Sequence, residues 1–261
     1  MRFNENIAVS TEKVLLVPYD AHHVPRYHQW MEDPAIREAT ASERLSLDEE
    51  YENQASWRES PDKLTFILCE PLLPQDPAPI VVAGVDDAPT KMIGDINLFL
   101  TPWDDDEDEQ QGQEPEKGEK TYYTAEVDIM IADSSHRGKG IGRAAVSTFL
   151  VFVRRHLDAI LAEYANADNT ATTTTPTSTP ALREVVAKIN ASNTGSIALF
   201  KSLGFVKKGD VNYFGEIRMV LADFEFASKG NGGKKTWEAA REGMYWECAF
   251  DRSRLGTDST G

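Results

Sequence analysis

A glycine-rich segment between a strand-like run and a long helix-like run constrains the fold of this chain more than any other feature. Residues 125–132 (AEVDIMIA) alternate apolar and polar side chains, which is the two-residue period of a strand. The glycines follow at once in residues 136–145 (HRGKGIGRAA), and an almost continuous apolar stripe from 142 to 164 then predicts one long helix. Because a strand that turns directly into a helix is half of a βαβ unit, we expect a mixed α/β fold with a sheet covered by helices.

Strands and helices are predicted on both sides of this unit. Further strands are expected at 13–19, 63–70, 92–100 and 182–190, with a final pair at 205–212 and 213–226. Helices are expected at 24–31 after a cap at Asp20, at 48–60 after the capping box of Ser46 and Glu49, and at 194–203 after a cap at Asn193. We expect residues 32–45 to form a loop, whereas residues 80–85 (IVVAGV) could extend the strand that ends at residue 70.

These elements fit a single domain over residues 1–227 with three inserts. The inserts are Pro-rich, acidic and Thr/Pro-rich, and they span 71–91, 102–121 and 164–181. Nine carboxylates stand against two lysines between residues 104 and 120, without an apolar period, so we expect a solvated, mobile loop there. Residues 228–261 are expected to be a partly flexible C-terminal extension with a short helix at 236–247.

Charge and cysteine content exclude some classes of function. A formal net charge of -16 disfavours unaided binding to nucleic acid or to an anionic membrane. The two cysteines, Cys69 and Cys248, are too few for a disulfide framework, and the five histidines have no partners at chelating spacing, so we expect no metal site. No apolar stretch approaches the length of a membrane span and the N-terminus has no export signal, so we expect a cytoplasmic protein.

The glycine-rich segment has the chemistry of an anion site. Successive backbone N–H groups converge at a turn that opens a helix, and the helix dipole adds positive potential. Gly138, Gly140 and Gly142 let a phosphate approach the backbone closely, while the three neighbouring cations can screen its charge. Those cations are Arg137, Lys139 and Arg143. The segment therefore predicts a site for a nucleotide diphosphate.

Three known patterns compete for these residues, along with a merely tight strand-to-helix turn. A Walker loop fails because the chain has no GxxxxGK[ST] string. A dinucleotide fingerprint is matched formally by Gly140, Gly142 and Ala145, but the Thr-rich run 171–175 follows where a strand ending in an acidic residue is needed. The remaining pattern, RxxGxG from Arg137 to Gly142, resembles the acetyl-CoA-binding motif of GNAT acetyltransferases.

A second segment resembles the same superfamily. NTGSIALFKSLGF at 193–205 is similar to the later helix-and-turn signature of GNAT proteins, and the resemblance as a whole covers residues 13–221. It implies a GNAT fold, with a central mixed sheet of about seven strands flanked by about four helices. At a finer level, strings such as VPYDAHHVPRYHQWM, TASERLSLDEEYENQASW and GDINLFL are similar to the eukaryotic alpha/beta-tubulin N-acetyltransferase family, also called N-acetyltransferase nine. That resemblance implies transfer of acetyl from acetyl-CoA to the N-terminal methionine amine of tubulin, by a monomer.

The resemblance also implies the residues that hold acetyl-CoA. Backbone groups of Met130, Ile131 and Ala132 are expected to pair with the pantetheine arm like an added strand. Two residues of the later helix segment, Asn193 and Lys201, are further candidates for cofactor contacts. The pyrophosphate is expected on the loop formed by Arg137, Gly138, Lys139, Gly140, Ile141, Gly142 and Arg143.

Acetyl transfer to an amine needs a base, because the amine attacks only in its neutral form. Glu126 is the first candidate, since AEVDIMIA resembles the GNAT strand that carries a glutamate in some histone acetyltransferases, and Asp128 is the second. Two residues apart on a strand, these carboxylates share a face, so their repulsion could raise one pKa. The alternative is that both line a solvated face or pair with neighbouring cations.

The acid and the acceptor are less determined. Many GNAT proteins carry a tyrosine as general acid in the later helix, but Phe200 occupies the matching position, which leaves water or a hydroxyl such as that of Tyr213. GNAT architecture would form the acceptor side from residues 32–45 and 212–215. A lysine or small-amine acceptor, or a weakly active acetyl-CoA-binding partner protein, remain as alternatives.

Overall fold

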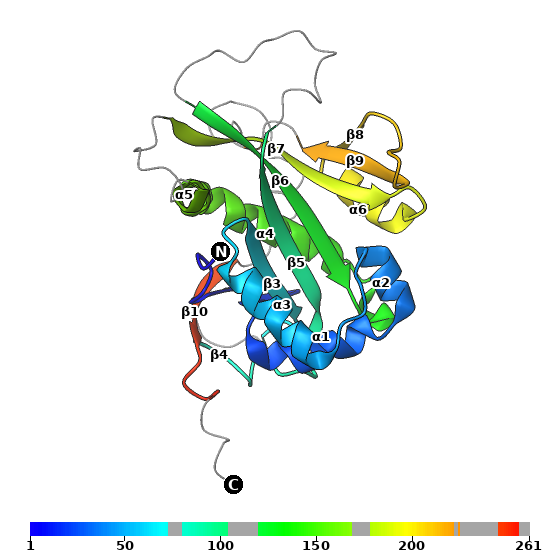
Figure 1. Ribbon diagram of the computed structural model, residues 1–261. Helices are drawn as coiled ribbons and strands as arrows, with labels where there is room; N and C mark the ends of the chain where they lie inside the picture. The colour runs from blue at the N-terminus through cyan, green and yellow to red at the C-terminus, as the bar shows by residue number, and fades with distance from the viewer. Residues whose placement is uncertain (73–79, 104–119, 169–177, 222–223, 225–244, 256–261) are drawn as a thin grey trace.

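The computed structural model describes residues 1–72, 80–103, 120–168, 178–221, 224 and 245–255 (Figure 1). Its strands form one mixed sheet in the order β4-β10-β1-β2-β3-β5-β6-β7-β9-β8. The strands are β1 Ile7–Ser10, β2 Leu15–Pro18, β3 Lys63–Cys69, β4 Val81–Val82, β5 Met92–Pro102, β6 Lys120–Ile131, β7 Thr179–Asn190, β8 Val206–Lys208, β9 Glu216–Leu221 and β10 Trp246–Asp251. The predicted GNAT-type mixed sheet is confirmed, although it has ten strands where about seven were expected.

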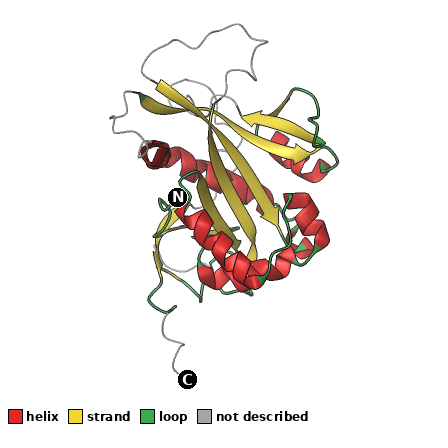
Figure 2. Cartoon of the chain, viewed as in Figure 1, coloured by secondary structure: helices red, strands yellow, loops and turns green. Residues whose placement is uncertain are grey.

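Helices cover both faces of this sheet (Figure 2). They are α1 Val24–Met31, α2 Pro34–Thr40, α3 Leu47–Glu59, α4 Ile141–Arg155, α5 Leu157–Asp168 and α6 Thr194–Ser202. Tyr27 and Trp30 of α1 pack with Ile67 and Met130 on one face, whereas Phe149 and Phe152 of α4 belong to a separate core on the other. No helix in the described part of the chain has both the length and the apolar character needed to cross a membrane.

Local capping signals predicted the helix starts correctly. Ser46 and Glu49 form the reciprocal capping box of α3, and Asn193 Oδ1 accepts a 3.1 Å hydrogen bond from the Ser196 N–H to cap α6. Asp20 caps a short 3₁₀ helix at 21–23 that leads into α1. Each cap involves residues no more than three positions apart, so each is encoded locally.

The prediction of a loop over 32–45 was wrong, because α2 lies within it. Asp33 caps this helix by accepting a 2.9 Å hydrogen bond from the Ala35 N–H, and Pro34 occupies its first turn. The helix ends at Ala41, which has a φ of 50° and so adopts the left-handed conformation that glycine usually provides. The prediction of a single helix from residue 142 was also wrong, since the helix is interrupted at His156, between α4 and α5.

The remaining differences are at the edge of the sheet. β1 and β10 pair antiparallel, and β4 pairs parallel with β10, so residues 80–85 do not extend β3. The helix expected at 236–247 is contradicted at its end, where residues 246–247 belong to β10, and residues 236–244 lie outside the described residues. The acidic run at 104–119 and the Thr-rich run at 169–177 also lie outside the described residues.

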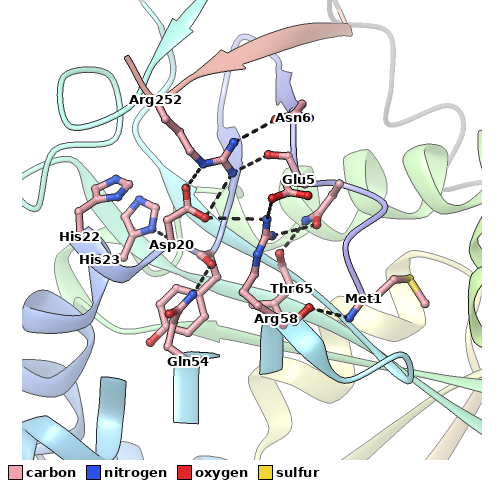
Figure 3. Close-up of polar contacts among 12 residues, drawn as sticks. Met1, Glu5, Asn6, Asp20, His22, His23, Gln54, Arg58, Thr65 and Arg252 are labelled. Carbon is pink, nitrogen blue, oxygen red and sulfur yellow. Dashed lines mark hydrogen bonds and ion pairs between the residues drawn. The ribbon is translucent and has the colours of Figure 1, made fainter. Parts of the chain in front are cut away.

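An ionic network fastens the β10 end of the chain to the N-terminal strands (Figure 3). The Arg252 guanidinium donates to the Asp20 carboxylate at 2.5 Å, to Asn6 Oδ1 at 3.1 Å and to the Glu5 carbonyl at 2.5 Å. Arg58 of α3 lies 3.9 Å from the carboxylates of both Asp20 and Glu5, so the Asp20 carboxylate is shared by two guanidinium groups. The network joins segments that are more than 230 residues apart in the sequence.

The central strands β6 and β7 diverge, and this divergence positions the site. Parallel pairing runs from Lys120 opposite Thr179 to Glu126 opposite Val186, and then stops. Beyond that point β7 continues beside β9, while β6 continues beside β5 (Figure 1). The β7-facing edge of residues 127–131 is therefore left without a strand partner, ready to accept one.

Candidate active site

A pocket of about 630 Å³ opens where β6 separates from β7. Its wall combines the end of β6, the glycine-rich loop, the first turns of α4 and α6, and α2. The predicted site residues on this wall are Asp128, Met130, Ile131, Ala132, Arg137, Gly138, Gly140, Ile141, Gly142, Arg143 and Asn193. Three predicted site residues, Glu126, Lys139 and Lys201, are not part of it.

The glycine-rich loop adopts the backbone conformation that its sequence predicts. Gly138 and Gly140 have φ values of 72° and 79°, in the left-handed region where a side chain would be strained. Gly140 is the residue before α4, so the free N–H groups of the first turn of that helix point toward the pocket mouth. A loop of this kind at the start of a helix has the geometry that favours an anion.

Cations surround this loop in more than one role. The Arg137 guanidinium donates to the carbonyls of Ile131 and Ala132 at 3.0 and 3.2 Å, so it holds the end of β6 in place. Arg143 likewise donates to the Ser202 carbonyl at 3.2 Å. Lys13, which the sequence did not single out, places its Nζ only 3.7 Å from the position that a Cβ on Gly140 would occupy. Lys13 thus adds positive charge beside the loop from the segment between β1 and β2.

The end of β6 is locked against β5 by a close backbone approach. A Cβ on Gly94 would lie 1.8 Å from the Met130 carbonyl oxygen, which is far inside any tolerated contact. Next to it, the Ala132 N–H donates to the Ile93 carbonyl at 3.0 Å. Glycine at position 94 therefore fixes how the residues that line the pocket are presented.

The two candidate bases differ in their surroundings. Glu126 forms a 2.9 Å ion pair with Lys188 of β7, as the cation-pairing alternative anticipated. Asp128, by contrast, opens onto the pocket. Desolvation by the surrounding protein raises the pKa of Asp128, and the Glu126 carboxylate raises it further, against the backbone hydrogen bond of Ile129. A carboxylate with a raised pKa beside a pocket can take up a proton from a bound amine.

Neither Phe200, which stands where many GNAT proteins carry a tyrosine, nor the candidate proton donor Tyr213 lines the pocket. Phe200 is buried in the core and packs edge-on against Phe205 with ring centroids 5.0 Å apart. Tyr213 is almost fully exposed in the turn between β8 and β9. Among the described residues the pocket wall has no tyrosine, but it does include the hydroxyls of Ser134 and Ser196 and the imidazole of His136.

Residues 32–45 were expected on the acceptor side of the site, and part of this segment lines the pocket, but sequence reasoning missed that this part is the helix α2. Asp33, Ile36 and Thr40 all line the pocket. The Asp-Pro pair at 33–34 is an N-cap followed by proline in the first turn, a signal that could have predicted the helix start. The helix end had no signal, because Ala41 stands where glycine is expected.

His22, His23 and Asp87 form a cluster whose geometry resembles a metal site. Both His23 nitrogens are already engaged, since Nδ1 accepts a hydrogen bond from the Asp20 N–H at 3.0 Å and Nε2 lies 3.0 Å from Asp87. His22 Nε2 lies 2.9 Å from the same carboxylate oxygen. The cluster thus works as a hydrogen-bonded clasp between the 3₁₀ helix and the turn at 84–87.

Comparison with known proteins agrees with this geometry. The family described as "Acetyltransferase (GNAT) domain" matches residues 13–206. The chain is 37% identical to the Drosophila melanogaster protein named alpha/beta-tubulin-N-acetyltransferase 9, over 84% of this chain and 88% of that protein. It is 34% identical to the Homo sapiens protein of the same name, over 85% and 86% of the two chains.

Relatives from other organisms and solved structures extend the comparison. A Caenorhabditis briggsae protein named N-acetyltransferase 9-like is 36% identical over 85% of this chain and 88% of its own. The crystal structure of spermidine N-acetyltransferase from Vibrio cholerae, in complex with CoA and spermine, shares the fold with a TM-score of 0.52 at 15% identity, over 82% of this chain and 98% of that one. The chain therefore belongs to the GNAT acetyltransferases, within the N-acetyltransferase 9 family, and is an N-acetyltransferase.

Proposed function

We propose that this protein transfers the acetyl group of acetyl-CoA to the α-amine at the N-terminus of a protein, with α- and β-tubulin chains as acceptors. The use of acetyl-CoA as the donor is supported by one observation: the edge of β6 that has no strand partner lies directly beside the glycine-rich start of α4. The acceptor half is supported by the relatives named for tubulin, which the chain matches over most of its length. We further propose a monomer acting in the cytoplasm, in keeping with two buried free thiols, Cys69 and Cys248.

Each part of acetyl-CoA has a fitting partner in the pocket. The pyrophosphate binds the N–H groups around Gly140 and Gly142, with positive charge from Lys13 and Arg143 nearby. The pantetheine arm lies along the free edge of residues 127–131 and pairs with its backbone as an extra strand would. The thioester then lies near the point where β6 and β7 separate, beside Asp128.

The reaction follows from this placement. Asp128 accepts a proton from the ammonium group, and the neutral nitrogen attacks the thioester carbonyl carbon. A backbone N–H at the end of β6 stabilises the oxygen as it becomes negative. The C–S bond then breaks and the nitrogen passes its second proton to water as the amide forms. The thiolate of CoA takes a proton from water, so the products are the amide, CoA as its thiol, and one proton on Asp128. The Glu126–Lys188 pair stands beside this path as an electrostatic neighbour of Asp128.

An α-amine suits a carboxylate base. With a pKa of about 8, roughly a tenth of an α-amine is neutral at pH 7, compared with about 0.04% of a lysine side chain. The α-amine is the more acidic of these two groups, so Asp128, whose pKa is raised, removes its proton more easily than that of a lysine. The proposed acceptor therefore demands less of the base than a lysine would.

Labelled acetyl-CoA distinguishes this function from its alternatives. Short peptides that begin Met-Arg and contain an internal lysine are incubated with the protein, with either a free or a blocked N-terminus. We expect label on the α-amine of the free peptides only, located by mass spectrometry. Label on lysine or on a polyamine would instead assign another amine acceptor. Acetyl-CoA binding without transfer to any amine would identify an acetyl-CoA-binding partner protein and overturn the proposal.

A further inference from the structure

A row of polar side chains crosses the sheet: Thr65 and Asn97 in it are buried, and it ends at Asp128, which is exposed on the pocket wall. Thr65 of β3 lies directly opposite Asn97 of β5, and Asn97 lies directly opposite Asp128 of β6. Directly opposed residues of antiparallel strands project to the same face, so these three form a line toward the pocket. Asp95, two residues before Asn97 on β5, shares that face beneath α1.

Asp95 is fully enclosed but only half satisfied. Its Oδ2 accepts hydrogen bonds from the Tyr27 hydroxyl at 3.3 Å and from Asn97 Nδ2 at 3.0 Å. Its Oδ1, together with Asn97 Oδ1 and the Thr65 hydroxyl, is buried without a hydrogen-bond partner. An unsatisfied buried polar atom costs about 1–3 kcal/mol, and three in one row are not explained by packing.

Ionisable groups face Asp95 from each neighbouring element. Asp128 lies diagonally across on β6, Tyr27 comes from α1, and Tyr19 follows β2. Behind the two tyrosines lies Glu50 of α3, which in turn is near His28 of α1. Burial raises the pKa of Asp95 to about 7, with the Asn97 and Tyr27 hydrogen bonds opposing the rise and the charge of Asp128 adding to it. Asp95 therefore changes charge in the neutral range, next to the carboxylate that faces the pocket.

We propose that Asp95 is a positioning residue for acetyl transfer, whose buried carboxyl group sets the proton affinity of Asp128. This proposal rests on the proposed function, in which Asp128 takes the proton of the acceptor amine. While Asp95 is protonated, Asp128 has a neutral neighbour and binds a proton weakly. Once Asp95 ionises, its negative charge strengthens proton binding at Asp128, which makes Asp128 a stronger base toward the proton of the acceptor amine. Asp95 acts through its charge and exchanges no atom with the substrate.

Asp95→Asn tests this directly, because asparagine has nearly the same shape and stays neutral at every pH. We expect the kcat of Asp95→Asn to equal that of wild type at pH 6 and to be about tenfold lower at pH 8.5. A tenfold difference corresponds to a coupling of one pKa unit. Thr65→Val is the matched control, since it alters the same row without altering its charge, and its kcat ratio should not vary with pH. A ratio for Asp95→Asn that is constant from pH 6 to 8.5 would mean a structural role and overturn the proposal.

A second measurement does not depend on activity. Carboxyl ¹³C NMR of aspartate-labelled wild-type protein follows the titration of Asp95, assigned by its absence from Asp95→Asn. We expect a midpoint near neutrality that falls by about one unit in Asp128→Asn. A midpoint in the ordinary aspartate range, or one unchanged by Asp128→Asn, would refute the coupling even in a folded and active protein. Absence of acetyl transfer by wild-type protein, together with the expected NMR shift, would refute the proposed function but leave the coupled pair standing.

Discussion

Replacing Gly94 by alanine should damage both the stability of the sheet and the donor site. The new Cβ would lie 1.8 Å from the Met130 carbonyl oxygen and 2.9 Å from the Met130 carbonyl carbon. Both are backbone atoms in the middle of a sheet, so no side-chain rotation relieves the contact. β5 and β6 must move apart by more than about 1 Å, in a core that is packed to crystal-like density.

The cost can be worked from that displacement. Overpacking of this kind costs about 1–3 kcal/mol. The 3.0 Å hydrogen bond from the Ala132 N–H to the Ile93 carbonyl lies directly beside the contact and would be stretched out of range, which adds about 1 kcal/mol. We therefore expect a loss of about 3 kcal/mol in the free energy of unfolding, or roughly 6–12 °C in Tm for a chain of this size.

Urea unfolding and acetyl-CoA calorimetry measure the two effects separately. A shift of about 1 Å in residues 130–132 misplaces the edge that would pair with the pantetheine arm, so acetyl-CoA affinity should fall at least about tenfold. Gly195→Ala is the control for the stability measurement, because its nearest contact would be 3.8 Å away, in a helix where alanine is favoured. It is not a control for affinity, since Gly195 lines the pocket. Wild-type stability and affinity in Gly94→Ala would show that the β5–β6 approach does not hold the site.

Three further predictions follow from side chains. Asp128→Asn should lower kcat by about 100-fold or more while leaving acetyl-CoA affinity within about twofold, as stopped-flow acetylation and calorimetry can check; an unchanged kcat would exclude it as the base. Hydrogen bonds with the two histidines of the clasp lower the pKa of Asp87 despite its burial, so its contribution to stability is present above the unfolded pKa near 4 and is lost as pH falls below it. The loss of unfolding free energy between pH 5 and 3 should therefore be smaller in Asp87→Asn, and an equal loss in both proteins would contradict this. Arg252→Ala should cost about 2 kcal/mol in urea unfolding, because it breaks four hydrogen bonds at the β10 end, whereas Arg2→Ala, whose 4.0 Å pair is exposed, should stay within about 0.5 kcal/mol; equal effects would argue against the network.

Most of the donor site could be predicted from the sequence because its determinants are local. The strand, the glycines and the helix start are contiguous between residues 125 and 145, and the positive φ of Gly138 and Gly140 is a property of glycine itself. The caps at Ser46 and Asn193 likewise depend on residues within three positions. Where a local signal was absent, as at the end of α2, the prediction failed.

The edge strands could not be predicted, because each is stabilised by partners far away in the sequence. β4 has two residues and β1 has four, too few to show a period; β4 pairs with β10, and β1 lies between β10 and β2. The same is true of the network around Arg252. Long-range pairing of this kind adds three strands to the seven that were expected.

The sequence by itself determined the conformation of the glycine-rich loop, since glycines without side chains at the start of a helix leave N–H groups free wherever that helix lies. Only the tertiary structure decided how the carboxylates are used. It brought Lys188 of β7 against Glu126, turned Asp128 toward the pocket where β6 and β7 separate, and enclosed Asp95 beneath α1. The physical reason is that the proton affinity of a carboxylate depends on the charges and solvent around it, and those neighbours come from strands and helices up to about a hundred residues away along the chain.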